Sequence, residues 1–347
     1  MPSLLTWYPQ TARLLPWREN PTPYRVWISE IMLQQTRVQA VLPYFDRFMN
    51  TLPDIQSLAR VEEDRLLKLW EGLGYYNRAR NLKKTAILLM EKHEGTLPRN
   101  FDSLLNLPGI GRYTAGAILS IAYNEPYPAV DGNVLRILTR LLALDTPIDG
   151  DPFKRSIEEL LKAEYTRENA SDLTQALMEL GAVVCGPNQA PQCGNCPWEA
   201  LCLAHKEGRE EAFPVRAEKK PRRVEKRTIL LIRDGERILL QKRPKKGLLA
   251  GLYEFPGETG FLKEKEALSV VEAMGFTPLH IEPAPKAKHL FSHVEWEMMG
   301  YLIRTAEMET APEGKLLVEL SQAGREFAIP SALRAYAEFL GIKRGNR

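Results

Sequence analysis

The segment Cys185-Gly-Pro-Asn-Gln-Ala-Pro-Gln-Cys193-Gly-Asn-Cys196-Pro-Trp-Glu-Ala-Leu-Cys202 contains all four cysteines of the chain. Four thiols placed so closely in the sequence are most simply explained as four ligands of one metal centre. Two disulfides are a weaker explanation, because the chain is long and nothing in it suggests export. Zinc accepts four thiolates, as a 4Fe–4S cluster does, and composition does not separate the two.

The rest of the chain has the composition of an ordinary globular protein. It has 347 residues, of which 44% are hydrophobic and 26% charged, and this length predicts about two domains. The net charge of +3 is only mildly basic and does not by itself demand a nucleic-acid partner. We find no apolar run of membrane-spanning length and no signal-peptide pattern at residues 1–10, which predicts a cytoplasmic protein without a membrane partner.

Hydrophobic periodicity divides the chain into two domains. Residues 1–213 read as helical, with apolar residues at helical spacing in Val26–Leu42, Asp64–Leu73, Asn81–Lys92, Thr114–Ala122, Val134–Leu144, Phe153–Ala163 and Leu173–Val184. Residues 214–227 are dense in charge and predict an exposed linker.

The pattern changes after the linker. Two strand-like runs, 228–233 and 237–242, flank Asp234-Gly235, which predicts a β-hairpin. A helix near 263–274, strands near 289–294 and 298–304 and a helix near 331–340 complete an α+β domain over 228–347.

The most informative helical segment is Leu107-Pro-Gly-Ile-Gly-Arg-Tyr-Thr-Ala-Gly-Ala117. Two glycines, Gly109 and Gly111, precede an apolar helix start, so backbone N–H groups there can approach a phosphate closely. A plain tight helix–turn–helix, with glycines for packing, explains the motif equally well.

Two carboxylates carry the chemistry that we expect. Asp131 stands just before an apolar helix, where it can be an ordinary N-cap, and a helix N-terminus also keeps a carboxylate ionised. Glu30 has mostly apolar neighbours, and a half-buried carboxyl would hold its proton, although an exposed Glu on an amphipathic helix is the commoner case. One ionised and one protonated carboxyl is the arrangement that glycosidic cleavage uses.

The chain resembles the MutY-type adenine DNA glycosylases of the endonuclease III superfamily. The stretches that carry the resemblance are Leu15–Arg18, Ser29–Thr36, Trp70–Arg78, Leu107–Gly111, Val130–Asn133, Glu179–Ala182 and the cysteine segment. The resemblance implies a multidomain fold, in which an all-α helix-hairpin-helix glycosylase domain (hairpin around 104–118, iron–sulfur loop 185–202) precedes an α+β Nudix-like domain. It also implies a 4Fe–4S cluster, rather than zinc, on Cys185, Cys193, Cys196 and Cys202.

The family's catalytic roles transfer to this chain residue by residue. Glu30 is implied to be the acid that protonates adenine N7, and Asp131 the carboxylate that stabilises the oxocarbenium-like sugar. Asn133 and Tyr113 are implied to orient Asp131 and the extruded nucleotide. The remaining implied roles are an adenine pocket (Trp17, Arg18, Glu179), wedge residues that fill the stack (Gln35, Tyr75) and a DNA-binding hairpin (Leu107, Gly109, Gly111).

Two features of the sequence distinguish this chain from other members of the superfamily. Bifunctional members of the superfamily carry a lysine directly after Gly-x-Gly-Arg, where this chain has Tyr113, so we expect weak or no lyase activity and an abasic product. The family usually spaces its cysteines with six, two and five intervening residues, whereas seven residues separate Cys185 from Cys193 here. We expect the insertion, within 186–192, to bulge as a loop.

The second domain is expected to read the opposite base. Its Gly247–Gly257 run resembles the family's Trp-Glu-Phe-Pro element, with Tyr253 in place of Trp. The helix over 263–275 lacks the Arg-Glu-x-x-Glu-Glu spacing of a Nudix hydrolase, which argues against pyrophosphate hydrolysis. Phe291, Ser292 and His293 match the Phe-Ser-His loop that contacts 8-oxoguanine in the family, although the same residues could simply cap a strand.

The sequence therefore predicts a base-excision repair enzyme. We expect a monomer that removes adenine from duplex DNA containing A:8-oxoguanine or A:G mispairs. Two alternatives remain: an endonuclease III-like lyase, which Tyr113 and the appended domain disfavour, and an iron–sulfur nucleic-acid-binding protein without catalysis, which the presence of both Glu30 and Asp131 disfavours.

Overall fold

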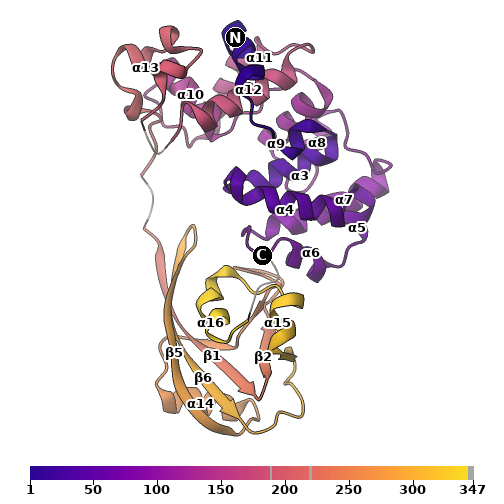
Figure 1. The fold of residues 1–347 in the computed structure, drawn as a ribbon, viewed down its shortest axis with the longest axis vertical. Coiled ribbons are helices and arrows are strands. Elements are labelled where there is room, and N and C mark those ends of the chain that lie inside the picture. The colour runs from indigo at the N-terminus through magenta and orange to yellow at the C-terminus, as the bar shows by residue number, and fades with distance from the viewer. Residues whose placement is uncertain (188–189, 219–220, 343–347) are drawn as a thin grey trace. The chain divides into compact units, whose positions relative to one another are not determined.

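The computed structural model describes residues 1–187, 190–218 and 221–342, and these residues form two compact units. One unit comprises Met1–Val61 and Asn81–Lys219, and the other Glu62–Arg80 and Lys220–Arg347. Figure 1 shows that the first unit is helical and that the second is built on a β-sheet.

The helical unit is assembled from short and medium-length helices joined by tight turns. Its helices are α1 (Pro2–Thr11), α2 (Pro16–Glu19), α3 (Pro23–Leu33), α4 (Val38–Thr51), α5 (Ile55–Arg60), α7 (Asn77–Lys92, whose first turn belongs to the other unit), α8 (Phe101–Leu105), α9 (Arg112–Ala117), α10 (Gly132–Leu141), α11 (Asp151–Lys162), α12 (Ala170–Val183) and α13 (Leu203–Lys206). A π-helical turn, Ile118–Ala122, continues α9.

One hydrophobic core of this unit lies where α1, α10, α11 and α12 pack together. Helix α12 repeats apolar residues at helical spacing, and its Leu173, Leu177 and Leu180 are fully buried in this cluster. Trp198, from the cysteine segment, packs into the same cluster. The cysteine segment is therefore anchored on α10 and α12.

The structure corrects the single helix expected over 26–42. Helix α3 ends at Leu33 and α4 begins at Val38, because Gln35 adopts a left-handed backbone conformation with φ of 57° that interrupts the helix. The apolar periodicity continues across the break, so it gives no sign of the turn.

Helices α8 and α9 form the hairpin expected around 104–118. Gly109 has φ of +79°, and a Cβ there would lie 2.7 Å from Cβ of Asn81, so this turn admits only glycine without rearrangement. Leu107 and Ile110 are 5% and 4% exposed and fix the hairpin to the core.

The second unit is organised around one seven-stranded sheet. The strands are β1 (Arg223–Asp234), β2 (Arg237–Lys242), β3 (Tyr253–Glu254), β4 (Gly257–Thr259), β5 (Pro278–Leu290), β6 (Val294–Thr305) and β7 (Lys315–Glu319). The main order is β3-β2-β1-β6-β5, with β4 on β1 and β7 on β2, and the β1–β6 pair is parallel. The β1–β2 pairing of Asp234 with Arg237 confirms the expected hairpin.

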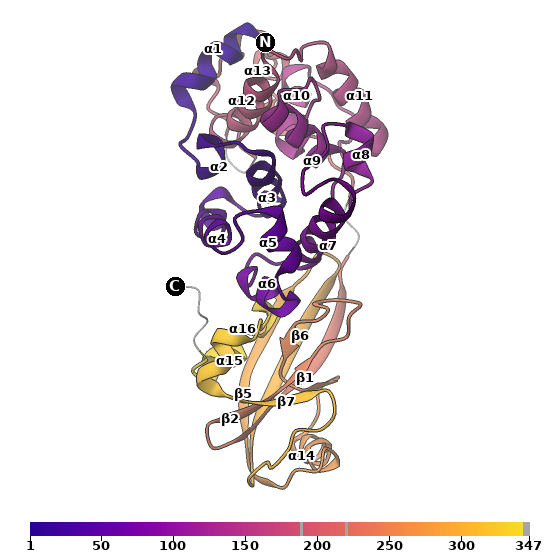
Figure 2. The same ribbon diagram turned by 90° about the vertical axis from the view of Figure 1, so that its right-hand side faces the viewer.

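The central strands of this sheet are buried on both faces. In β1, Ile229 and Leu231 face one core cluster while Leu230 and Ile232 face the other, as the two-residue period of a strand requires. Helix α14 (Glu264–Ala273) covers the second face. Figure 2 shows α15 (Leu320–Glu326) and α16 (Arg334–Phe339) on the side opposite α14.

Two boundaries differ from the expected domains 1–213, 214–227 and 228–347. Strand β1 begins at Arg223 and pairs with β6 from there, so residues 223–227 belong to the sheet rather than to a linker. The segment Glu62–Arg80, with α6 (Glu63–Leu69), belongs to the unit that contains the sheet. Its amphipathic pattern indicates a helix and carries no information about which core the helix joins.

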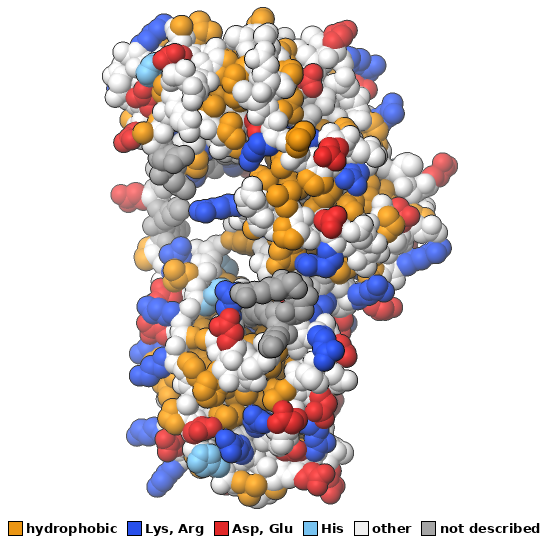
Figure 3. Space-filling model, viewed as in Figure 1, with side chains coloured by type: hydrophobic (Ala, Val, Ile, Leu, Met, Phe, Trp, Pro, Cys, Tyr) orange, Lys and Arg blue, Asp and Glu red, His pale blue; other side chains and the backbone are white. Residues whose placement is uncertain are grey.

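On the face drawn in Figure 3, basic and acidic side chains are interspersed, in keeping with the net charge of +3. None of the helices in the described ranges is long and apolar enough to cross a membrane.

Candidate active site

A cleft of about 1630 Å³ in the helical unit collects seven of the residues that the sequence singled out. Its walls come from α2, α3, α9, α10 and α12, which are far apart in the sequence. The expected site residues that line it are Trp17, Arg18, Glu30, Gln35, Tyr113, Asp131 and Asn133.

Glu30 is a buried carboxyl, 4% exposed, on the inner face of α3. Burial raises the pKa of Glu30 and the nearby Asp131 adds to the rise, whereas a hydrogen bond donated by the Tyr113 hydroxyl opposes it; the resulting pKa is about 7. The side chain is therefore present in both protonation states near neutral pH, so it can hold a proton and release it.

Asp131 is the N-cap of α10. Its Oδ1 accepts hydrogen bonds from the backbone N–H groups of Asn133 and Val134, both at 2.8 Å, and its Oδ2 accepts one from Nδ2 of Asn133 at 2.7 Å. Burial raises the pKa of Asp131 above its ordinary value, and these three donors oppose the rise. Because the donors hold its oxygens, Asp131 is the carboxyl of the pair that is built to carry negative charge.

A buried arginine connects this carboxylate to the cysteine segment. Arg136, 4% exposed, donates to Oδ1 of Asn133 at 2.9 Å and to the backbone carbonyl of Cys185 at 2.8 Å. Gly181 makes room for this arrangement, since a Cβ there would lie 2.6 Å from Cβ of Asn133. The orientation of Asn133 therefore depends on both α12 and the start of the cysteine segment.

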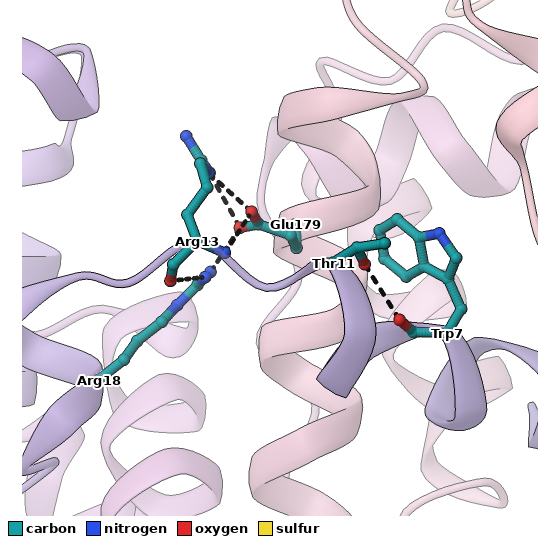
Figure 4. A network of polar contacts seen from close by, with 5 residues as sticks. All are labelled: Trp7, Thr11, Arg13, Arg18 and Glu179. Carbon is teal, nitrogen blue, oxygen red and sulfur yellow. Dashed lines mark hydrogen bonds and ion pairs between the residues drawn. The ribbon is translucent and has the colours of Figure 1, made fainter.

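A second buried glutamate, Glu179, lies in a different environment. Glu179 is fully buried and is held by Arg13 at 2.7 Å and Arg18 at 2.8 Å, as Figure 4 shows. Burial alone would raise the pKa of Glu179, but the two guanidinium groups outweigh burial and lower it. Glu179 is consequently a fixed anion that holds Arg13 and Arg18 at the wall of the cleft.

Trp17 supplies a flat apolar wall to the cleft. It is 6% exposed, and its indole meets the ring of Phe45 edge to face at 5.2 Å between centroids. The indole next to the two arginines gives a surface suited to a planar ring that also accepts hydrogen bonds.

The four cysteines converge. All are free thiols and line one small cavity of about 30 Å³, together with Arg140 and Glu210. Burial raises the pKa of Cys193 and Cys196 to about 11, so these thiols keep their protons unless a cation is bound. Cys185 lines the cavity with the other three despite its longer spacing, and part of the intervening loop, 188–189, lies outside the described residues. The donor set fits a group that takes four thiolates.

Polar side chains surround this cavity. Arg140 is 5% exposed and places a guanidinium nitrogen 3.2 Å from Sγ of Cys185. At another corner, ligand atoms of Cys193, His205 and Glu210 lie within 4.8 Å of one another, a set that zinc also accepts.

Several expected site residues lie outside the cleft. Phe291, Ser292 and His293 form the turn between β5 and β6, and the hydroxyl of Ser292 lies 3.0 Å from the hydroxyl of Tyr75. Ser292 and Tyr75 both belong to the second unit. Tyr75 is half-exposed and has φ of 47°, a conformation rare for a bulky residue and often associated with function. Gln35 shares this conformation.

The expected hairpin residues, Leu107, Gly109 and Gly111, also lie outside the cleft. Gly109 and Gly111 lie in the α8–α9 turn, and Gly111 is the N-cap of α9, whose first N–H groups have no side-chain cap. The side chain of Leu107 is buried, so only its backbone is available for contacts outside the core.

Three arginines of these sites were not predicted from the sequence. Arg13, Arg136 and Arg140 hold the glutamate, the asparagine and the cysteine segment described above. Arg136 and Arg140 could have been noticed, because they lie one turn apart on a largely apolar helix. Arg13 gave no such signal, since it precedes α2 in an irregular stretch.

Known proteins resemble this chain in sequence and in fold. Residues 28–163 match the HhH-GPD superfamily base excision DNA repair protein family, and residues 228–338 match the NUDIX domain. Over 60% of this chain and 94% of the other, the fold matches the endonuclease III trapped in a covalent complex with DNA, with a TM-score of 0.52 and 27% identity.

Curated relatives extend the similarity over both units. The adenine DNA glycosylase of Rattus norvegicus is 34% identical over 97% of this chain and 77% of its own length. The adenine DNA glycosylase of Buchnera aphidicola subsp. Acyrthosiphon pisum is 36% identical over 87% and 85%, respectively. The chain therefore belongs to the adenine DNA glycosylase family, within the HhH-GPD superfamily of base excision DNA repair proteins.

Proposed function

We propose that this protein hydrolyses the N-glycosidic bond of adenine mispaired with 8-oxoguanine, or with guanine, in duplex DNA. The observation that carries the proposal is the carboxyl pair of the cleft: Glu30, with a pKa of about 7, and Asp131, with three donors on its carboxylate. A duplex hides the glycosidic bond, so the adenine nucleotide is extruded into the cleft before the reaction.

Protonated Glu30 donates its proton to N7 of adenine and so makes the base a neutral leaving group. As the glycosidic bond breaks, positive charge develops on the sugar, and the carboxylate of Asp131 stabilises it. Water then adds to the sugar and leaves an abasic site. Asn133 fixes the carboxylate of Asp131, and Tyr113 holds the acid in place through its hydroxyl.

The base itself is recognised by the opposite wall of the cleft. Trp17 stacks against the planar ring, while Arg18 and Arg13, held by Glu179, offer N–H donors to its acceptor nitrogens. Removing Glu179 would release both arginines at once.

The reaction stops at the abasic site. Tyr113 occupies the position where a lyase needs an amine, and a phenol cannot form a Schiff base with the sugar. We therefore propose a monofunctional glycosylase that acts as a monomer.

A 4Fe–4S cluster is the group we propose for the four cysteines. When bound, it would supply four metal–thiolate bonds that fix the 185–202 loop and, through the Arg136 contact to Cys185, the orientation of Asn133. Cys185, Cys193, Cys196 and Cys202 would hold it, and bond cleavage depends only on the cleft side chains.

Two groups of residues engage the rest of the duplex. The backbone of the 107–111 hairpin and the basic side chains at the cleft, among them Arg37 and Arg155, bind phosphates. Gln35 and Tyr75 fill the stack where the base has left, and Tyr75 with Ser292, Phe291 and His293 reads the 8-oxoguanine edge. The 3.0 Å contact between the two hydroxyls supports this grouping.

The test is a single-turnover glycosylase assay on duplexes with adenine opposite 8-oxoguanine, guanine or thymine. We expect alkali-labile abasic sites, fastest opposite 8-oxoguanine, with few nicks before alkali treatment. Efficient nicking that borohydride traps would contradict the monofunctional assignment. Equal rates opposite all three bases would contradict the lesion preference.

A further inference from the structure

The segment Glu62–Arg80 carries Tyr75 and is fastened to the sheet unit by charged side chains. At its start, Asp64 accepts hydrogen bonds from Nζ of Lys242 at 2.6 and 2.8 Å and from the hydroxyl of Tyr253 at 2.7 Å. The tyrosine at 253 thus contributes a hydroxyl that the family's tryptophan could not place there. At the end of the segment, Arg80 donates to the carbonyl of Ala250.

The middle of the segment is held by a buried ion pair. The side chains of Lys68 and Glu71 are 15% and 1% exposed, and their charged atoms lie 2.6 Å apart. Lys68 Nζ also donates to the carbonyls of Gly324 at 2.7 Å and Phe327 at 3.1 Å, and Glu71 Oε1 accepts from N of Ile329 at 2.8 Å. The pair therefore satisfies three backbone groups next to α15.

The loop after this pair is held in one conformation. Nε1 of Trp70 donates to the carbonyl of Gly74 at 3.1 Å, and the guanidinium of Arg78 donates to the carbonyls of Leu73 and Gly74. Tyr75 follows directly, in its left-handed conformation, with its hydroxyl at Ser292. Strained residues of this kind persist only where their surroundings determine the conformation.

We propose that Lys68 and Glu71 are positioning residues for recognition of the base opposite adenine. They hold the 70–78 loop on the sheet unit so that Tyr75 and Ser292 form one preformed reader. This inference rests on the proposed function of the second unit. The pair suits the task because loss of the Glu71 carboxylate leaves the charge of Lys68, 15% exposed, without this counter-charge, which weakens the docking of the segment.

Glu71→Gln is the variant that tests the proposal, because the amide keeps the shape and the contact to Ile329 but leaves Lys68 without its counter-charge. Asp234→Asn is the matched control. Asp234 likewise pairs with an arginine, Arg237 at 2.5 Å, and accepts from a backbone N, that of Met308 at 2.7 Å. The β1–β6 register puts Asp234 at the strand end roughly 35 Å from the Ser292 turn.

We expect Glu71→Gln to reduce the preference for A:8-oxoguanine over A:G roughly tenfold, the size of one good base contact, and Asp234→Asn to leave it unchanged. In a Tyr75→Phe background, which lacks the hydroxyl, Glu71→Gln should cause no further loss of preference. Additive losses in that background would mean that the pair has a merely structural role and would overturn the proposal.

Amide hydrogen exchange on the full chain without DNA separates this inference from the proposed function. Glu71→Gln should speed exchange of the 72–78 amides, and Asp234→Asn should not. Unchanged exchange in Glu71→Gln overturns the positioning role whatever the enzyme prefers. A wild type without lesion preference overturns the proposed function instead. If Glu71→Gln is insoluble, the double variant Lys68→Met with Glu71→Gln is used in its place in each measurement, because it also removes the charge of Lys68.

Discussion

Glu30 and Glu179 are both buried glutamates of the helical unit, and their surroundings give them opposite properties. Glu30 is 4% exposed, lies among apolar residues of α3 and receives its hydrogen bond from a neutral hydroxyl, and its pKa is raised to about 7. Glu179 is fully buried between two guanidinium groups, and its pKa is lowered. The two guanidinium groups that hold Glu179 outweigh the effect of burial there, whereas burial dominates at Glu30.

The comparison separates two ways of using a buried carboxyl. A group held by neutral partners keeps a proton that it can transfer, at the expense of folding stability at alkaline pH. A group held by cations stays ionised and stabilises the fold while it orients its partners for recognition. Variants at Glu30, Glu179 and Tyr113 each change one of these two carboxyls or a partner that sets its pKa.

The largest expected effect is on the chemistry at Glu30. Glu30→Gln should slow single-turnover excision of adenine by about 10²- to 10⁴-fold, because the amide cannot donate the proton. Duplex binding, measured by fluorescence anisotropy, should persist. Glu19→Gln, at an exposed glutamate of α2, is the control and should excise normally. Normal excision by Glu30→Gln would remove this residue from the mechanism.

The second effect concerns the ionised glutamate. Glu179→Gln should destabilise the protein by about 3 kcal/mol at pH 7, because two arginines lose a buried counter-charge. The folded pKa of Glu179 lies below its ordinary value of 4.5, so its contribution is present above that pH and fades as the pH falls through the folded pKa. Thermal unfolding of variant and wild type at pH 4 and pH 7 checks this. A loss that does not shrink at low pH would show that shape, not charge, holds this corner.

The third effect is the opposite change in stability at Glu30. Because its folded pKa of about 7 exceeds the ordinary 4.5, the folded state binds more protons than the unfolded state between these values, and stability falls as pH rises through them. Glu30→Gln should therefore be more stable than wild type by about 3 kcal/mol at pH 8 and equal to it near pH 4. Unfolding scans at the two pH values measure the difference, and equal midpoints at pH 8 would refute the raised pKa.

The smallest expected effect concerns the Tyr113 hydroxyl, which lowers the pKa of Glu30. Tyr113→Phe removes a donor that stabilises the carboxylate, so the pKa of Glu30 should rise by about one unit. The alkaline limb of the pH–rate profile for excision, which falls as Glu30 loses its proton near pH 7, should move to higher pH by the same amount. Asn133→Ala, which acts on Asp131, should lower the rate without moving this limb. An unmoved limb in Tyr113→Phe would mean that another group sets it.

Much of this protein follows from local sequence features. The hairpin at Asp234-Gly235, the glycine turn before Arg112 and the N-cap at Asp131 each depend on a few adjacent residues, and the structure confirms all three. The convergence of the four cysteines follows from their spacing in the same way. The break at Gln35 could not be predicted, because the apolar period runs through it.

What the sequence alone determined is the set of chemical groups: a four-thiol segment, two carboxyls and the run Phe291-Ser-His293, each marked by neighbours along the chain. Tertiary structure decided their states, because a pKa and a contact depend on residues distant in sequence. Burial raises the pKa of Glu30, whereas Arg13 and Arg18 lower that of Glu179. The buried pair Lys68–Glu71 assigns Tyr75 to the sheet unit. Such choices depend on desolvation and on which core a helix joins, and neither is written in its periodicity.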